Sequence, residues 1–262
     1  MQRRYLLLAP LQIGSALRRL EHWLELGGIA DHEGDVKGRG HPFKVHVRAA
    51  AAEALATNVT LTDAAVYDQA LKRRGEAEEI DLLVRIGDVI LVGEVKCFTR
   101  RTEAMGQFNY LKKLDHATDQ AARKLAWAEA NREQIAQLFG LSDPARVAEL
   151  SFKGVVVVNH SYGVGLERRG VPVVDLHYLT LLLGVKAYQG ATKFEKGVGM
   201  TYVMQELYAD EADFLERLDE NLSNSPVMAR YRDVIGWREI PFLRSDGGTL
   251  AIAIPTLSTA PF

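Results

Sequence analysis

The most regular run of apolar positions lies in residues 79–96, where two segments rich in Val, Ile and Leu flank Gly87-Asp88. A Gly-Asp dipeptide between such segments favours a tight two-residue turn, so this stretch is predicted to form a β-hairpin. A two-residue turn places Ile86 opposite Val89 and thereby fixes the register of both strands. The other predicted elements are arranged around this hairpin.

Four charged side chains of the predicted hairpin share one face. The register places Asp81 directly opposite Glu94. Two residues farther from the turn, Glu79 lies opposite Lys96. Because side chains alternate along a strand, all four point the same way, and Glu79 is expected to hold the Lys96 ammonium.

The rest of the pattern predicts an α/β fold in which a mixed central sheet carries helices on both faces. The core order is helix, three strands, helix, strand, followed by one further strand and helix. The segments flanking the hairpin are helix 44–57, strand 59–70, helix 107–138, buried strand 154–159, edge strand 171–175 and helix 176–183.

Segments outside this core differ in composition. Helical spacing predicts a helix over 11–26, and residues 31–41 are typical of a loop. Residues 205–222 carry seven acidic side chains and one basic side chain, so a helix there is expected to repel phosphate and to face solvent, a protein partner or a second copy. A closing hairpin is expected over 240–254. The predicted organisation is an N-terminal helical extension (1–42), a core (43–185) and a C-terminal extension (186–262).

Overall composition narrows the class of protein. With 262 residues and 47% hydrophobic content the chain can bury a full core. The net charge of −2 excludes a globally basic surface, so any contact with nucleic acid needs a local patch. A single cysteine, Cys97, excludes an internal disulfide, and cytoplasm is the expected compartment. The apolar stretch 6–11 is too short to span a membrane, and no membrane role is expected.

Opposed carboxylates on paired strands repel one another unless a positive charge lies between them. Mg²⁺ or Mn²⁺ would supply that charge, because both ions prefer carboxylate oxygens. Removal of Asp81 or Glu94 is then expected to stabilise the metal-free protein. Lys96 could orient an attacking water or stabilise charge at phosphorus. The alternative is a solvated strand face with a weak Glu-x-Lys ion pair, a spacing that arises by chance in a chain of this size.

The segments Glu79-Ile80-Asp81-Leu82 and Glu94-Val95-Lys96, separated by Gly87-Asp88, resemble the signature of the PD-(D/E)XK (restriction-endonuclease-like) nuclease superfamily. Glu78 stands where one variant of this signature has Gly. The resemblance covers roughly residues 43–185 and implies metal-dependent hydrolysis of phosphodiester bonds in nucleic acid, with DNA as the first candidate. It also implies that Asp81, Glu94 and the Val95 carbonyl ligate Mg²⁺ or Mn²⁺, and that Lys96 is the catalytic lysine.

Two further residues enter through this resemblance. The first helix of the superfamily often carries a Glu near the metal, and Glu53 is the acidic residue of helix 44–57; a simple surface carboxylate is the alternative. The helix after Glu-x-Lys commonly points a Gln or Lys toward the site, and Gln120 is the candidate. An amphipathic helix with an ordinary polar flank is the alternative for Gln120.

A local basic patch is expected in residues 96–124, which hold seven Lys or Arg against three acidic residues. His116, Gln120 and Lys124 recur at intervals of four and share a helix face. The expected nucleic-acid-binding residues are Arg100, Arg101, Lys113, His116, Arg123 and Lys124. Two functional classes remain open: a metal-dependent endonuclease, and a nuclease-fold module that binds nucleic acid or protein without catalysis.

Overall fold

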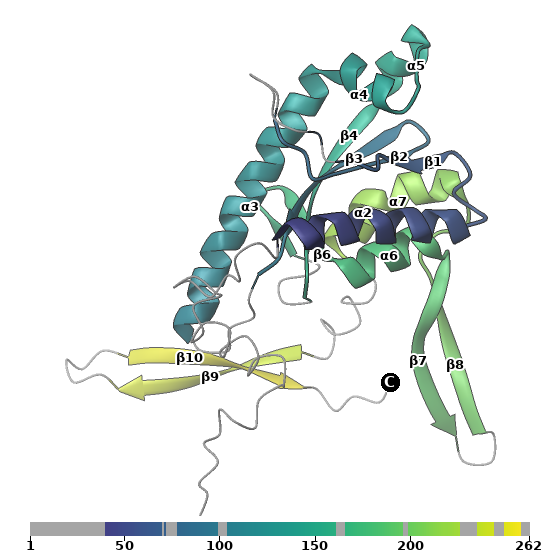
Figure 1. Cartoon of the computed structure of the whole chain (residues 1–262). Helices are drawn as coiled ribbons and strands as arrows, with labels where there is room; N and C mark the ends of the chain where they lie inside the picture. The colour runs from purple at the N-terminus through teal and green to yellow at the C-terminus, as the bar shows by residue number, and fades with distance from the viewer. Residues whose placement is uncertain are drawn as a thin grey trace, which may run out of the picture. The chain divides into compact units, whose positions relative to one another are not determined.

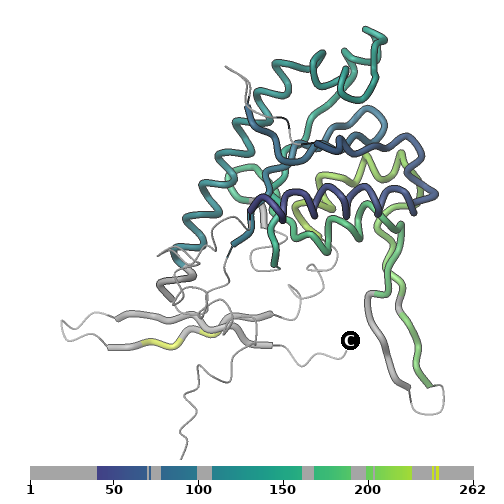
Figure 2. Tube along the Cα trace, in the orientation of Figure 1, coloured from purple at the N-terminus to yellow at the C-terminus, as the bar shows by residue number. Residues whose placement is uncertain are grey.

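The structure is a computed structural model, traced in Figure 2. It describes residues 40–69, 71, 78–98, 104–160, 166–195, 199–225, 235–243 and 249–257. The helix expected over 11–26 and the expected site residues Arg100 and Arg101 lie outside these ranges. The chain divides into two compact units, the first ending at Gly184 and the second beginning at Val185.

The first unit contains a mixed six-stranded sheet in the order β1-β2-β3-β4-β6-β5. β3 is parallel to β4 and β4 is parallel to β6, whereas the remaining pairs are antiparallel. The predicted α/β class with a mixed sheet is therefore confirmed. The strands are β1 (Ala64–Val66), β2 (Leu82–Ile86), β3 (Val89–Lys96), β4 (Ser151–Val158), β5 (Leu166–Arg168) and β6 (Val171–Asp175).

Helices cover both faces of this sheet (Figure 1). On one face α2 (Gly40–Thr57) packs beside α6 (Leu176–Gly184). The other face carries α3 (Ala104–Ala130), whose end leads into α4 (Arg132–Leu138) and α5 (Pro144–Glu149). Figure 1 shows α2 and α6 running side by side, away from α3. The sheet is thus buried between two helical layers, as its continuous apolar strands predict.

The predicted hairpin and its register are confirmed by β2 and β3. Ile86 pairs with Val89, and the ladder continues to Leu82 opposite Gly93. Gly87 opens the turn with a φ of 53°, a left-handed value that glycine adopts without steric cost. All five residues of β2 are buried. Continuing this register by one step places Asp81 beside Glu94 at the end of the ladder.

Small residues let α3 approach the sheet closely. The buried side of the helix carries Ala117, Ala121 and Ala128. Opposite them on β4 stands Gly154, where an added Cβ would lie 3.4 Å from Leu125 Cδ2. This packing sets α3 against β3 and β4.

Several predicted boundaries in the first unit are wrong. The strand expected over 59–70 is limited to the three residues of β1. The helix expected over 107–138 is interrupted at Asn131, whose side-chain amide donates to the Trp127 carbonyl at 2.8 Å. Such local side-chain bonds compete with the helical ladder. The stretch between β4 and β6, where no strand was predicted, contains the short strand β5. It is joined to β6 through Arg169 and Gly170, both at positive φ.

The described residues of the second unit form two hairpins and one helix. The hairpin of β7 (Ala187–Glu195) and β8 (Gly199–Glu206) was not predicted. The acidic helix α7 (Glu211–Ser223) begins after β8, because the Asp210 side chain caps it by accepting from Asp213 N at 2.9 Å. The hairpin predicted over 240–254 is longer, comprising β9 (Ile235–Leu243) and β10 (Thr249–Leu257). No helix in the described ranges is both long and apolar enough to span a membrane.

Candidate functional site

Two buried carboxylates meet where β2 and β3 stop pairing. Asp81 is 0% exposed and Glu94 is 2% exposed. Asp81 lies one residue before β2, and its Oδ2 accepts a hydrogen bond from the Val95 N–H at 3.1 Å. This bond replaces the backbone pairing that ends at Leu82 and holds the Asp81 carboxylate against β3.

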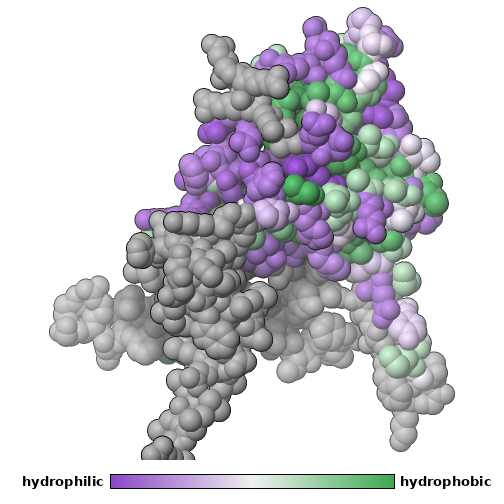
Figure 3. Space-filling view, viewed as in Figure 1, coloured by the Kyte–Doolittle hydropathy of each residue, from purple (hydrophilic) through white to green (hydrophobic). Residues whose placement is uncertain are grey.

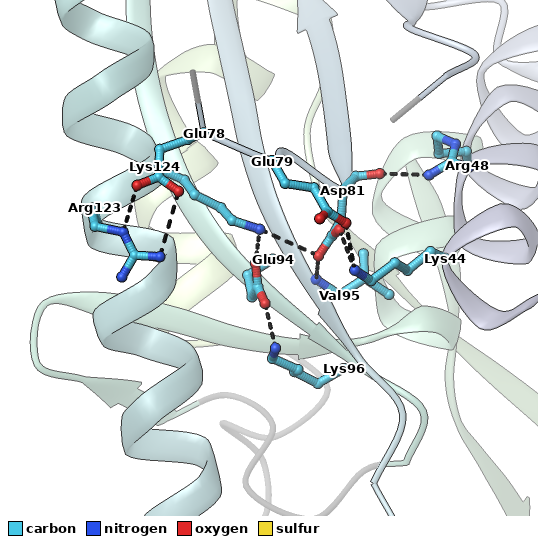
Figure 4. A network of polar contacts seen from close by, with 10 residues as sticks. All are labelled: Lys44, Arg48, Glu78, Glu79, Asp81, Glu94, Val95, Lys96, Arg123 and Lys124. Carbon is cyan, nitrogen blue, oxygen red and sulfur yellow. Dashed lines mark hydrogen bonds and ion pairs between the residues drawn. The ribbon is translucent and has the colours of Figure 1, made fainter. Parts of the chain in front are cut away.

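The helix α3 supplies a lysine to this pair. The Lys124 side chain is 7% exposed, and its ammonium forms an ion pair with Glu94 Oε2. The same Nζ lies 3.6 Å from Asp81 Oδ2. Lys124 occupies the buried stripe of α3, three residues after Ala121 and four before Ala128. The close approach of α3 to the sheet therefore sets its ammonium between the two carboxylates (Figure 4).

The helix α2 supplies two cations from the opposite layer. Lys44 Nζ lies 2.7 Å from Asp81 Oδ1 and 3.2 Å from Glu79 Oε1. One helical turn later, the buried Arg48 donates from Nη1 to the Asp81 backbone carbonyl at 2.8 Å. Residues four apart share a helix face, so one face of α2 fixes both the backbone and the side chain of Asp81.

Lys96, at the end of β3, completes the group. Its Nζ lies 2.6 Å from Glu94 Oε1, and its side chain is 27% exposed. Among the lysines in Figure 4, Lys124 and Lys44 approach from the two helical layers, whereas Lys96 extends from the strand itself. Glu94 thus contacts Lys124 through one oxygen and Lys96 through the other.

The charges in this cluster shift the acid–base equilibria of two members. Burial alone would raise the pKa of the Asp81 carboxyl, but Lys124, Lys44 and the Val95 N–H together hold it below its ordinary value. Burial likewise acts to lower the pKa of Lys44, yet its ion pairs with Asp81 and Glu79 raise it. Asp81 is therefore ionised at neutral pH, and Lys44 is protonated.

The carboxylate oxygens of Asp81 and Glu94 are the donor atoms that a divalent cation could use here. Asp81 Oδ1 is buried without a partner in hydrogen-bond geometry, although Lys44 Nζ lies close to it. Mg²⁺ is commonly held by one or two carboxylates, with waters and substrate phosphate completing its shell. Asp81 and Glu94 could provide those two carboxylates. Within the described residues no group of three or more His, Cys, Asp or Glu side chains converges on a common point.

Glu53 does not join the cluster. It is exposed on α2, nine residues after Lys44, which corresponds to about half a helical turn of rotation and roughly 13 Å along the axis. The structure therefore places it as a surface carboxylate. The Val95 atom that contacts Asp81 is its N–H, so a metal-ligating role for the Val95 carbonyl stays a prediction.

The expected pairing of Glu79 with Lys96 is wrong. The cation that contacts Glu79 is Lys44, and Lys96 turns instead to its strand neighbour Glu94. Hairpin spacing alone cannot show this, because the competing cation comes from α2, some 35 residues earlier in the chain. The expected repulsion between the two carboxylates is also compensated, since three ammonium groups surround them.

The expected nucleic-acid contacts on α3 have different surroundings. His116 and Arg123 are exposed, and the Arg123 guanidinium pairs with Glu78 at 2.7 Å. Lys113 is half-buried. Gln120 is half-buried too, and its Oε1 is buried with no hydrogen-bond partner. Hydrophilic side chains gather over α3 on the face shown in Figure 3.

Sequence reasoning missed the roles of Lys44 and Arg48 altogether. Both lie on the same side of α2 as buried Val47 and Ala51, so a basic pair at helical spacing beside an apolar stripe was the available signal. For Lys124 the signal was its position among the small residues of α3. A long cation at a core position of a helix requires a buried anion nearby.

Comparison with protein-family models, with curated proteins and with solved structures finds no match to this chain.

Proposed function

We propose that this chain is a metal-dependent endonuclease of the restriction-endonuclease-like type, which hydrolyses phosphodiester bonds of nucleic acid, with DNA as the first candidate. The observation that carries the proposal is the convergence of buried Asp81 and Glu94 with Lys96 at paired strand ends. The order of α2, β1, β2, β3, α3 and β4 around this point agrees with the fold that the sequence resemblance implies.

The roles follow from position. Asp81 and Glu94 would hold Mg²⁺ or Mn²⁺, which when bound supplies a Lewis acid for the phosphoryl oxygen and a more acidic water. Lys96 extends from the end of the strand and is partly exposed, so its ammonium can reach a substrate phosphate or an attacking water. Lys44 and Arg48 hold Asp81 in place from α2.

The surface of α3 supports a phosphate-facing role. Two acidic residues of the basic segment 96–124 are paired with arginines from the other end of the sheet. Arg168 contacts Asp115 at 2.6 Å, and Arg169 contacts Asp119 at 2.7 Å. These pairs neutralise two acidic residues on a flank that also displays His116, which reduces the repulsion that a phosphate backbone would meet there.

A second candidate is a nuclease-fold module that binds nucleic acid or protein without cleaving it. The observation that favours it is charge compensation: Lys44, Lys96 and Lys124 face Glu79, Asp81 and Glu94, so the carboxylates are balanced without a metal. The buried Arg48 adds a fourth cation beside Asp81. A cluster that is compensated in this way can be a purely structural one.

Cleavage by the full chain separates the two candidates. Plasmid and short structured DNA and RNA are incubated with wild type, Lys96→Ala and Lys186→Ala in Mn²⁺ or Mg²⁺. Lys186 is an exposed lysine outside the basic segment 96–124, so its variant is a matched control. We expect wild type and the control to cut, and Lys96→Ala to lose about 10²-fold or more in rate. Equal cleavage by Lys96→Ala, with circular dichroism showing an intact fold, would refute the assignment.

A further inference from the structure

Lys124 occupies the space that a cation bridging the two carboxylates would need. Each outer oxygen lies beside another ammonium: Lys44 Nζ is 2.7 Å from Asp81 Oδ1, and Lys96 Nζ is 2.6 Å from Glu94 Oε1. The inner oxygens, Asp81 Oδ2 and Glu94 Oε2, both face the Lys124 ammonium.

The burial of Lys124 makes its position between the two carboxylates energetically important. A buried ammonium is strongly unfavourable unless carboxylates and hydrogen bonds compensate it, and the Lys124 side chain is 7% exposed. The carboxylates are equally dependent on it, because like charges on paired strands repel one another. Lys124 therefore acts as an internal counter-ion for the site and not as an ordinary surface base.

We propose that Lys124 and the divalent cation compete for Asp81 and Glu94, so that metal enters the site by displacing the Lys124 ammonium. This inference rests on the proposed function, because it takes the same two carboxylates as metal ligands. The four-carbon stem of lysine allows such a movement without a change in the helix. The displaced ammonium stays at the mouth of the site, where a substrate phosphate is its natural new partner.

A thermodynamic consequence follows for substrate binding. If metal expels Lys124 and phosphate receives it, each ligand favours the binding of the other, and the coupling is equal in both directions. The affinity of the protein for metal is then low without nucleic acid, and metal and nucleic acid bind cooperatively. Lys124 is in this account a regulatory residue of the metal site as well as a phosphate contact.

The test is calorimetric titration of Mn²⁺ into the full chain without nucleic acid, so that the readout is independent of activity. Wild type is compared with Lys124→Met, with Lys124→Gln in case the first variant folds poorly, and with Lys112→Met, at an exposed lysine of α3, as the matched control. We expect both Lys124 variants to bind Mn²⁺ about ten-fold or more tightly than wild type, a change that corresponds to about 1.4 kcal/mol. The rise in melting temperature on adding Mn²⁺ should also be larger for them.

The outcomes separate failure of this inference from failure of the proposed function. Unchanged or weaker Mn²⁺ binding by both Lys124 variants, with wild type binding lost in Asp81→Asn, would overturn the competition and leave the metal site standing. If wild type and all Lys124 variants bind no Mn²⁺, the metal site itself is refuted, and the inference with it. Tighter binding that is abolished when Asp81→Asn is added to Lys124→Met supports both.

Discussion

Replacing Asp81 by Asn removes one negative charge at a fully buried position while keeping the shape of the side chain. The Asn carbonyl can still accept the Val95 N–H, so this hydrogen bond need not be lost. What changes is the charge balance: Lys44 retains Glu79 and Lys124 retains Glu94, but one of the three carboxylates is gone.

The size of the effect follows from this partial compensation. Removing one partner of a buried ion pair typically costs about 3–5 kcal/mol, because it leaves an uncompensated buried charge. Both lysines here keep a second carboxylate, so we expect Asp81→Asn to lower the free energy of unfolding by about 2–3 kcal/mol in metal-free buffer. This direction is opposite to that expected from the hairpin sequence alone, where removing Asp81 relieves repulsion.

The dependence on pH gives an independent check. The folded-state pKa of Asp81 lies below its ordinary value of 3.8, so the carboxylate contributes stability above about pH 4. That contribution disappears as the pH falls toward the folded-state pKa, because the unfolded chain then binds more protons than the folded one. The difference between wild type and Asp81→Asn should therefore be full at pH 7 and shrink below pH 4.

Urea unfolding in EDTA, followed by tryptophan fluorescence at pH 7 and pH 3.5, measures both quantities. Asp68→Asn is the matched control, since Asp68 is exposed, and surface substitutions are usually within about 0.5 kcal/mol of neutral. If Asp81→Asn is as stable as wild type at pH 7, or more stable, the three lysines do not compensate the carboxylates and the electrostatic account of the site is wrong.

Three other perturbations test separate parts of the molecule. Gly93→Ala places a Cβ 2.9 Å from Leu82 Cβ, so we expect the free energy of unfolding to fall by about 1–3 kcal/mol and the melting temperature to fall with it. An unchanged melting temperature would contradict the hairpin packing. The pKa of Asp63 is lowered to about 2, chiefly by its hydrogen bond with Arg85. The Asp63 carboxylate should therefore contribute its full stabilisation of the fold above about pH 3.8 and lose it as the pH falls toward 2. Asp63→Asn should therefore melt below wild type at pH 7 and converge with it near pH 2 by circular dichroism. Charge reversal of the exposed acids of α7, Glu216→Lys with Asp219→Lys, should alter assembly in light scattering and leave cleavage intact; loss of cleavage with unchanged assembly would count against a partner role.

The hairpin was predictable because its determinants are local. Gly87 and Asp88 define the turn, and the flanking apolar runs leave little freedom in the register, since a one-residue slip would turn the whole apolar set to the wrong face. The same reasoning identified Asp81 and Glu94 as neighbours, and the structure buries both. The break at Asn131 was also visible in principle, because Asn side chains compete with helical backbone bonds.

The β7–β8 hairpin escaped prediction for a different reason. Its apolar residues Met200, Tyr202 and Met204 alternate, as a strand requires, but all three are exposed. Sequence reasoning used alternation as a sign of a face turned toward a core. A two-stranded ribbon with an exposed apolar face offers no such core within the described residues, so the pattern was present but its physical meaning differed.

The charge balance of the site depends on how α2 and α3 pack on the sheet, and the spacing of residues in the sequence does not reveal this packing. Lys44 lies on α2 and Lys124 lies on α3. Both lysines reach Asp81 because α2 packs on one face of the sheet and α3 packs on the other. The hairpin alone carries opposed carboxylates that need a cation between them. Once both helices are packed on the sheet, the lysines and Arg48 supply enough positive charge to compensate these carboxylates without a metal. The opposed carboxylates are therefore weaker evidence for a metal than the hairpin suggested. The discriminating residue becomes Lys124, because its burial is explained by Asp81 and Glu94 in either function, whereas its displacement by Mn²⁺ is expected only of a metal-dependent enzyme.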